Sequence, residues 1–440
     1  MTSARLPPGS TGLPLLGETL TFLRNPYGFI SERTAKHGPV FRTSLFGSKT
    51  AVIVGGEAAI HFIDPALVER AGSQPAPVFR LFAGPSVPHL DGPPFLDRKQ
   101  ILLRAFTREA LAGYLPATQA LVERALARFA SQPEVRLVRE LKRLALEAVA
   151  QDIMGIVDAR SLERLHGWYQ ALDLAFTGLP VALPGTNYAK GLQAVASITA
   201  FFGEVVRAHR EKPTGDGLSR ILAFQTPSGA TLTDDQAARE LHHLIIAGRV
   251  VYAHLVGMVL QLSQRPELQA ALRDEIRTVA PGRPLTVEQL LAMRHLSRVL
   301  MEVKRVAPVV PGMFGKAKTD IALGGYTIPR GWRLMFGLRQ GHLDGSIFAH
   351  PETFDPDRFG ESRREDQKHP HAFVPHGPGA PASSHHCAGT DYATQLAKLF
   401  TISLLRDYRF ELPPQNLEYD WGRLTPDPKD EVRAKILKQQ

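Results

Sequence analysis

The residue of this chain most able to do chemistry is Cys387, its only cysteine. It lies in the segment FVPHGPGAPASSHHCAG (373–389), whose glycines and prolines predict a loop, and an apolar helical pattern begins near Thr390. A thiol at a helix N-terminus has a lowered pKa and is readily deprotonated. The thiolate is then a nucleophile or a ligand for a soft metal. A lone cysteine also excludes an intramolecular disulfide and a cysteine-rich zinc site.

Taken alone, the loop leaves three interpretations open. A lone cysteine is most often a buried structural residue. His385 and His386 stand beside Cys387 and could act as the base of a cysteine hydrolase. The third interpretation is a metal ligand, and a second group of residues is needed to choose.

That second group begins with Glu302 and Arg305, which are three residues apart in the otherwise apolar helical segment SRVLMEVKRVAP. As an ion pair on a protein surface they would contribute well under about 1 kcal/mol. Arg358 follows in HPETFDPDRF (350–359), and Phe373 then opens the cysteine loop.

The series Glu-x-x-Arg, Phe-Asp-Pro-x-Arg-Phe, and Phe-x-x-x-Gly leading to Cys-x-Gly, in that order, resembles the cytochrome P-450 family of haem-thiolate oxidoreductases. The resemblance extends over essentially the whole chain, including its Pro-Pro-Gly opening. It implies haem b (iron protoporphyrin IX) as the cofactor and Cys387 as the proximal ligand of the iron. A thiolate ligand favours cleavage of an O–O bond.

The resemblance also implies roles for residues around the cysteine. Glu302, Arg305 and Arg358 match a buried triad that holds the segment before the cysteine loop. Phe373 opens the haem-binding loop and Gly389 belongs to its Cys-x-Gly end.

Contacts with the haem propionates are expected from two segments. His385, two residues before the cysteine, matches one such position. The segment FLDRKQILLRAF (95–106) resembles the helix that supplies the others, with Arg98 and Lys99 as its available cations. Phe95 stands where the family usually has a histidine, so one contact is expected to be missing.

The cysteine loop departs from the common pattern, because Phe373 and Cys387 are 14 residues apart. Most of the family has fewer residues between this phenylalanine and the cysteine. A longer loop resembles the peroxide-using branch, the fatty-acid peroxygenases and decarboxylases, as do LDGPPFLDRKQ and PPQNLEYDWGRL. Members similar to allene oxide synthase also carry an insertion here, and CAGTD has some likeness to them.

The central helical segment departs as well. The common pattern is Ala-Gly-x-acid-Thr; Ala247 and Gly248 fit, but Val250 and Val251 replace the acid and the threonine. That pair delivers protons to bound dioxygen, and losing a positioned proton donor costs about 10²–10⁴ in rate. The two valines therefore favour a peroxide, which arrives already reduced.

Arg249 lies between these residues in an apolar helical run without an acid three or four residues away. A buried charge without a counter-ion costs several kcal/mol, so we expect an anion from elsewhere. The peroxide-using branch carries an arginine on this helix, one position later, that binds the substrate carboxylate. A substrate carboxylate, a haem propionate and an acid on another helix remain open as the partner of Arg249.

The elements that must position these residues are mostly helical. Apolar residues at three-and-four spacing dominate 97–310, and the run 231–264 predicts a long helix buried through the centre. Strand patterns occur at 38–56 and again after 320. We expect a mainly α fold with a minor β region, as a single domain over residues 1–440.

Composition narrows the partners. The chain is 44% hydrophobic with a net charge of +9, and its basic residues are dispersed rather than clustered, which disfavours nucleic acid. No apolar run approaches the roughly 20 residues of a membrane span, and the first residues lack a signal-peptide pattern. We expect a cytoplasmic monomer that takes an apolar, lipid-like or polyketide-like substrate, with contacts from 73–90 and 174–188.

The sequence thus favours oxidation of a C–H bond by hydrogen peroxide or a hydroperoxide. One alternative is a conventional monooxygenase that uses dioxygen and electrons from a ferredoxin and reductase, whose acidic surface would suit a basic protein. The other is a haem protein that isomerises a substrate or only binds a ligand.

Overall fold

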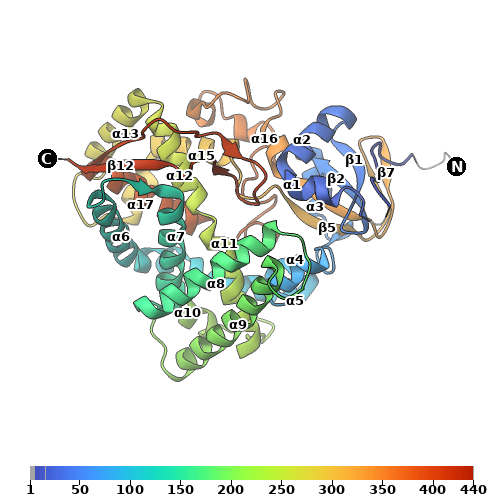
Figure 1. Ribbon diagram of the computed structural model, residues 1–440, viewed down its shortest axis with the longest axis horizontal. Helices are drawn as coiled ribbons and strands as arrows, with labels where there is room; N and C mark the ends of the chain where they lie inside the picture. The colour runs from blue at the N-terminus through green and yellow to red at the C-terminus, as the bar shows by residue number, and fades with distance from the viewer. Residues whose placement is uncertain (1–4, 15, 440) are drawn as a thin grey trace.

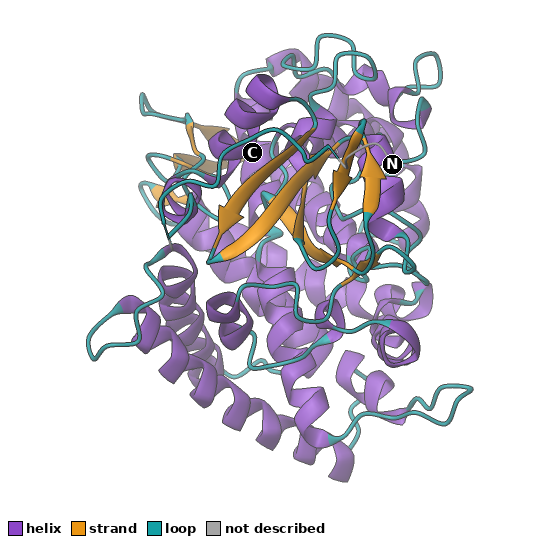
Figure 2. Ribbon diagram, turned by 90° about the vertical axis from the view of Figure 1, so that its right-hand side faces the viewer, coloured by secondary structure: helices purple, strands orange, loops and turns teal. Residues whose placement is uncertain are grey.

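The computed structural model describes residues 5–14 and 16–439. Figure 1 shows the helices that fill most of the molecule, and Figure 2 shows the small sheet beside them. The helices are α1 (Thr19–Arg24), α2 (Pro26–His37), α3 (Gly56–Ile63), α4 (Ala76–Leu81), α5 (Gly92–Leu103), α6 (Arg108–Ala130), α7 (Leu137–Met154), α8 (Ala159–Thr177), α9 (Asn187–Glu211), α10 (Gly217–Ala223), α11 (Asp234–Arg249), α12 (Tyr252–Ser263), α13 (Pro266–Val279), α14 (Val287–Ala292), α15 (Arg294–Val306), α16 (Leu338–His342) and α17 (Thr390–Asp407). The prediction of a mainly α, single-domain fold with a minor β region is confirmed.

The largest sheet has five strands in the order β1-β2-β8-β5-β3 and combines the N-terminal part of the chain with a segment almost 300 residues later. The strands are β1 (Val40–Leu45), β2 (Ser48–Val54), β3 (Val68–Glu69), β4 (Val135–Arg136), β5 (Gly312–Ala317), β6 (Ile321–Leu323), β7 (Tyr326–Ile328), β8 (Arg333–Gly337), β9 (Tyr408–Glu411), β10 (Tyr419–Asp420), β11 (Asp427–Pro428) and β12 (Arg433–Lys438). β1 and β2 pair antiparallel through a turn at Phe46 and Gly47, and β2 pairs parallel with β8. The sheet therefore forms only after distant parts of the chain meet.

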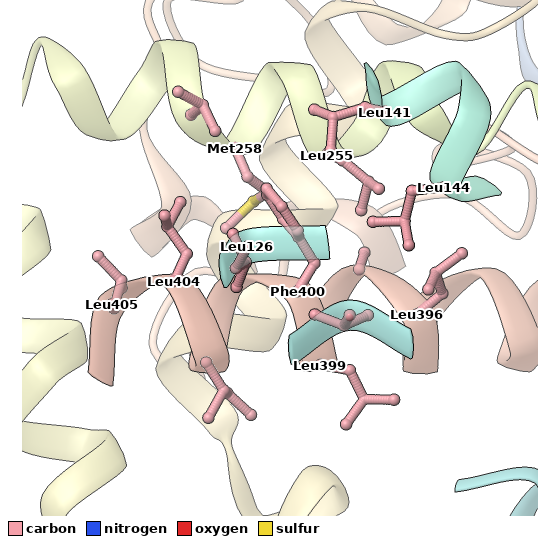
Figure 3. Packing of buried hydrophobic residues seen from close by; sticks show 14 of the residues in the cluster. Leu126, Leu141, Leu144, Leu255, Met258, Leu396, Leu399, Phe400, Leu404 and Leu405 are labelled. Atoms are coloured by element: carbon pink, nitrogen blue, oxygen red, sulfur yellow. The ribbon is translucent and has the colours of Figure 1, made fainter. Parts of the chain in front are cut away.

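The main hydrophobic core lies where α6, α7, α12 and α17 pack together. Figure 3 shows side chains from all four helices meeting there: Leu126, Leu141, Leu144, Leu255, Met258, Leu396, Leu399, Phe400, Leu404 and Leu405. Apolar residues at three-and-four spacing give each helix a stripe that this core buries. Because α17 follows the cysteine loop directly, the core fixes one end of that loop.

The central helix is divided. Thr233 is the N-cap of α11, and its side chain and that of Gln236 cap each other's backbone N–H groups. The sequence predicts one helix over 231–264, but a turn at Val250–Val251 separates α11 from α12. There the N–H of Val251 bonds to Gly248 and the N–H of His254 bonds to Val251, which is the tighter i→i−3 pattern. Gly248 and the two consecutive β-branched valines all have low helix propensity, which is consistent with a break here.

Within the described part of the chain, Asp234–Ser263 is the stretch long and apolar enough to cross a membrane. Two thirds of its most apolar window (67%) is buried inside the protein. The apolar character of α11 and α12 is therefore accounted for by packing in the core.

Candidate active site

A cavity that is partly open to solvent lies between α11–α12 and the cysteine loop. It brings together most of the residues selected from the sequence: Cys387, His385, Gly389, Lys99, Ala247, Gly248, Val250 and Val251. Arg98, Arg249, Phe373 and the triad do not line it. Residues nearly 300 positions apart in the sequence thus line the same cavity.

Cys387 lines the cavity just before α17 begins. The N–H of Cys387 donates to the carbonyl of His376 at 2.9 Å, and the carbonyl of Cys387 accepts from the hydroxyl of Thr390 at 2.9 Å. Burial raises the pKa of the Cys387 thiol, although the N–H of Gly389 and the charges of Lys99 and Lys304 lower it. The expectation of a lowered pKa from the helix N-terminus alone is therefore wrong, because desolvation outweighs it. A coordinated metal ion deprotonates a thiol outright.

The loop before the cysteine depends on glycine at two positions. Gly377 and Gly379 have φ values of 90° and 94°, which side-chain-bearing residues rarely adopt. His386 then closes the loop, since its ring contacts the carbonyl of Gly377 at 2.9 Å and the hydroxyl of Thr390 at 3.1 Å.

The three residues expected near the propionates have different partners in the structure. His385 stacks on Phe95, with ring centroids 4.0 Å apart, and burial lowers the pKa of His385 to about 3. Lys99 donates to the carbonyl of His386 and lines the cavity. Arg98 instead pairs with the buried Glu240 at 2.8 Å. Lys99 and His385 are therefore positioned to meet an anionic edge of the cofactor, whereas Arg98 already has its counter-ion.

The triad is assembled and fully buried. Glu302 accepts two hydrogen bonds from Arg305, at 2.7 and 2.8 Å, and one from Arg358 at 3.1 Å. Glu365, which the sequence analysis missed, pairs with Arg358 at 2.7 Å and balances the second guanidinium. All four side chains are at most 3% exposed. The cluster ties α15 to the segment that leads into the cysteine loop.

Arg249 is paired with Asp173 of α8, and Arg249 Nη1 lies 2.8 Å from Asp173 Oδ1. It points away from the cavity, consistent with its absence from the cavity wall. Of the three partners left open by the sequence, the structure provides an acid on another helix.

Val250 and Val251 both line the cavity at the helix break. Among the described residues that line it, none carries a carboxyl group or an aliphatic hydroxyl. The protonatable groups there are the thiol, Lys99, Tyr392 and five histidines: His243, His254, His376, His385 and His386.

His376 and Tyr392 escaped the sequence analysis, and His254, expected there to be a polar residue with its hydrogen bonds satisfied, has an unpartnered ring nitrogen in the described part of the chain. His254 and His376 face each other with ring centroids 6.0 Å apart, and His254 Nδ1 and His376 Nε2 have no hydrogen-bond partner among the described residues. Tyr392 reaches the cavity from α17. Their neighbours are distant in sequence, so no local spacing marks them.

The site fits a haem group held by a thiolate. It offers one half-buried cysteine, a mainly apolar cavity, buried polar atoms still without partners, and Lys99 for an acidic edge. The cysteine-hydrolase alternative lacks its base, because His386 is held by Gly377 and Thr390 and His385 stacks on Phe95.

Comparison with known proteins agrees with this site. The family model for cytochrome P450 matches residues 7–431. The chain is 30% identical to the putative cytochrome P450 120 of Synechocystis sp., over 99% of this chain and 98% of that protein. It is also 30% identical to abscisic acid 8'-hydroxylase 1 of Oryza sativa subsp. japonica, over 92% and 85%.

Two solved structures extend the comparison. Retinoic acid bound cyanobacterial CYP120A1 matches with a TM-score of 0.92 at 29% identity, over all of both chains. Cytochrome P450SP alpha (CYP152B1) in complex with (R)-ibuprophen matches with a TM-score of 0.82 at 23% identity, over 95% and 98%, which shows a shared fold. This chain belongs to the cytochrome P450 family of haem-thiolate oxidoreductases, with haem b as its cofactor.

Proposed function

We propose that this enzyme hydroxylates a C–H bond of an apolar, lipid-like small molecule and takes its oxidising equivalents from hydrogen peroxide or an organic hydroperoxide. One observation carries the proposal. Val250, Val251, Ala247 and Gly248 line the same cavity as Cys387, so the helix break offers no hydroxyl or carboxyl group to deliver protons to bound dioxygen.

The bound haem would supply the cleavage of the O–O bond, and the protein side chains would do the rest. Cys387 would hold the iron as its thiolate. Lys99 would offer its positive charge to a propionate, and the neutral ring of His385 would offer a hydrogen bond. The valines and Leu244 would exclude water from the side of the cavity where the substrate lies.

An isoprenoid acid is the substrate class we favour. Relatives similar to this chain are named for abscisic acid, and a structure of similar fold contains retinoic acid. Both molecules combine an apolar skeleton with one carboxylate, which suits an apolar cavity with an open mouth. Arg249 is not expected to bind that carboxylate, because Asp173 already balances it.

A conventional monooxygenase fed by a ferredoxin and a reductase is the second candidate. It is favoured by the hydroxylase names of relatives at 30% identity. In that case a water molecule or a substrate hydroxyl would have to replace the missing alcohol of the helix break. We further propose that the enzyme is a cytoplasmic monomer.

The test is turnover of purified haem-loaded protein with retinoic acid, abscisic acid and a series of fatty acids. We expect hydroxylated product with hydrogen peroxide alone. Cys387→Ser is the control, and it should lose both the product and the red-shifted carbon monoxide band of the reduced protein. Product only with ferredoxin, reductase and dioxygen would replace the first candidate by the second.

A further inference from the structure

Tyr392 lines the cavity and also forms a hydrogen bond with a buried carboxylate. It lies five residues after Cys387, on the first turns of α17, and is 3% exposed. Its ring lines the cavity, while its hydroxyl donates to Asp152 Oδ2 on α7 at 2.8 Å. One side of this residue therefore faces the cofactor space and the other faces a carboxylate.

Asp152 is a buried carboxylate held only by neutral donors. It is 3% exposed and accepts from the hydroxyl of Thr118 at 2.7 Å and from the amide of Gln151 at 3.0 Å. No lysine, arginine or histidine pairs with it in the part of the chain that the structure describes. Burial raises the pKa of Asp152 despite hydrogen bonds from Thr118, Gln151 and Tyr392, which lower it. A buried anion without a counter-ion is costly. An asparagine at position 152 could accept the same hydrogen bonds and link the same helices at a lower cost in free energy.

The geometry suits a transfer of one electron and one proton. A phenol gives up an electron much more easily when its proton can leave at the same time. The acceptor must lie within hydrogen-bond reach, about 2.6–3.2 Å, and the Tyr392–Asp152 pair meets this condition. The raised pKa of Asp152 makes its carboxylate a better proton acceptor.

The aromatic neighbours of Tyr392 lack such an acceptor. Tyr114 lies 6.4 Å from Tyr392 between ring centroids, but its hydroxyl donates to the backbone carbonyl of Ala105. Phe106, at 6.2 Å, has no proton to give. An electron deficit in this cluster is therefore most stable on Tyr392.

We infer that Tyr392 and Asp152 form a proton-coupled electron donor that reduces the oxidised cofactor when no substrate is bound. Tyr392 gives one electron to the cofactor and its hydroxyl proton to Asp152. The products are a neutral tyrosyl radical, a protonated Asp152 and a cofactor reduced by one electron. This step protects the residues that line the cavity from oxidation by the cofactor. The inference rests on the haem chemistry of the family and not on which oxidant the enzyme uses in the cell.

The experiment uses substrate-free, haem-loaded protein mixed with meta-chloroperoxybenzoic acid and frozen rapidly for electron paramagnetic resonance. The wild-type protein should give a tyrosyl radical. Tyr392→Phe and Asp152→Asn should each lower its yield by at least about tenfold and should speed bleaching of the haem. Asn keeps an acceptor for the hydroxyl but is not a base, so the second variant separates proton transfer from packing.

Tyr114→Phe is the matched control and should keep the radical, because this ring touches Tyr392 without a carboxylate. An unchanged yield in Tyr392→Phe or in Asp152→Asn would overturn the inference. A nitroso spin trap applied to the wild-type protein covers the case in which a variant does not fold. Digestion and mass spectrometry should then place the adduct on Tyr392, and an adduct on another residue would contradict the inference. The peracid bypasses the question of peroxide use, so failure of hydroxylation with hydrogen peroxide leaves this test intact.

Discussion

Val251 is the residue on which the proposed use of a peroxide depends most directly. It lines the cavity in the turn between α11 and α12, where the family's common pattern has a threonine. A valine has the shape of a threonine but neither donates nor accepts a hydrogen bond. The pattern of the sequence was sufficient to find this position and Cys387, because each follows a motif with fixed spacing.

Replacing Val251 with Thr should supply the missing hydroxyl. We expect product formation from dioxygen, ferredoxin and reductase to rise by about tenfold, since a positioned proton donor contributes about 10²–10⁴ and the neighbouring acid is still absent. Turnover with peroxide should change little. Val251→Ala is the control for altered volume, and an equal effect of Thr and Ala on the dioxygen reaction would show that the hydroxyl plays no part.

At the scale of elements, buried ion pairs connect segments that the sequence could not place together. Glu302 and Arg305 are marked by their spacing on α15, but Glu365 and Asp173 are not marked by any local pattern. The side chain of Asp173 is still 46% exposed, so solvent screens its pair with Arg249. Breaking the cluster around Glu302 should therefore lower the free energy of unfolding more than breaking the pair of Arg249 and Asp173.

Glu302→Gln should be strongly destabilising. It leaves Arg305 without its carboxylate and Arg358 with Glu365 alone, in a cluster where Glu302 is 0% exposed. Breaking such a buried pair costs about 3–5 kcal/mol in the free energy of unfolding. Glu361→Gln, at an exposed pair with Arg294, is the matched control. Chemical denaturation of both variants checks this, and equal midpoints would refute the role assigned to the cluster.

Arg249→Met and Asp173→Asn should act alike, because each breaks the same link between α11 and α8. We expect each to lower stability by no more than about 1 kcal/mol. Neither variant should change the ratio of dissociation constants for an isoprenoid acid and its methyl ester, measured by spectral titration. A selective loss of affinity for the acid in Arg249→Met alone would instead identify Arg249 as a ligand of the substrate carboxylate.

At the scale of the whole molecule, helices recognised by period and a cysteine loop recognised by motif were predictable, whereas their meeting points were not. The break of the central helix, the Arg98–Glu240 pair and the Tyr392–Asp152 contact all depend on tertiary packing.

Folding also creates charge pairs whose contribution to stability depends on pH. The pair of His209 and Asp216 is one of them, and it joins the end of α9 to the start of α10.

The hydrogen bond that His209 donates to the carboxylate of Asp216 raises the pKa of His209. Burial would raise the pKa of Asp216, but hydrogen bonds from His209, Ser219 and Thr214 lower it on balance. Stabilisation by His209 is thus complete below its unfolded pKa of about 6.5 and is lost as pH rises through the folded value. Stabilisation by Asp216 is complete above about 3.9 and is lost as pH falls through its folded value.

The difference in unfolding free energy between the wild-type protein and His209→Gln should therefore be largest between about pH 4 and 6.5 and should shrink at higher pH. Denaturation across this range measures it. A difference that stays constant with pH would mean that the charge of His209 does not contribute.

The source of the oxygen atom in the product tests the central claim most directly. The haem-loaded enzyme would be given a substrate it hydroxylates, once with isotopically labelled hydrogen peroxide in ordinary air and once with labelled dioxygen, ferredoxin and reductase. We predict that the label enters the product from hydrogen peroxide, at a rate well above that of the dioxygen reaction. Efficient labelling from dioxygen, with none from hydrogen peroxide, would contradict the account.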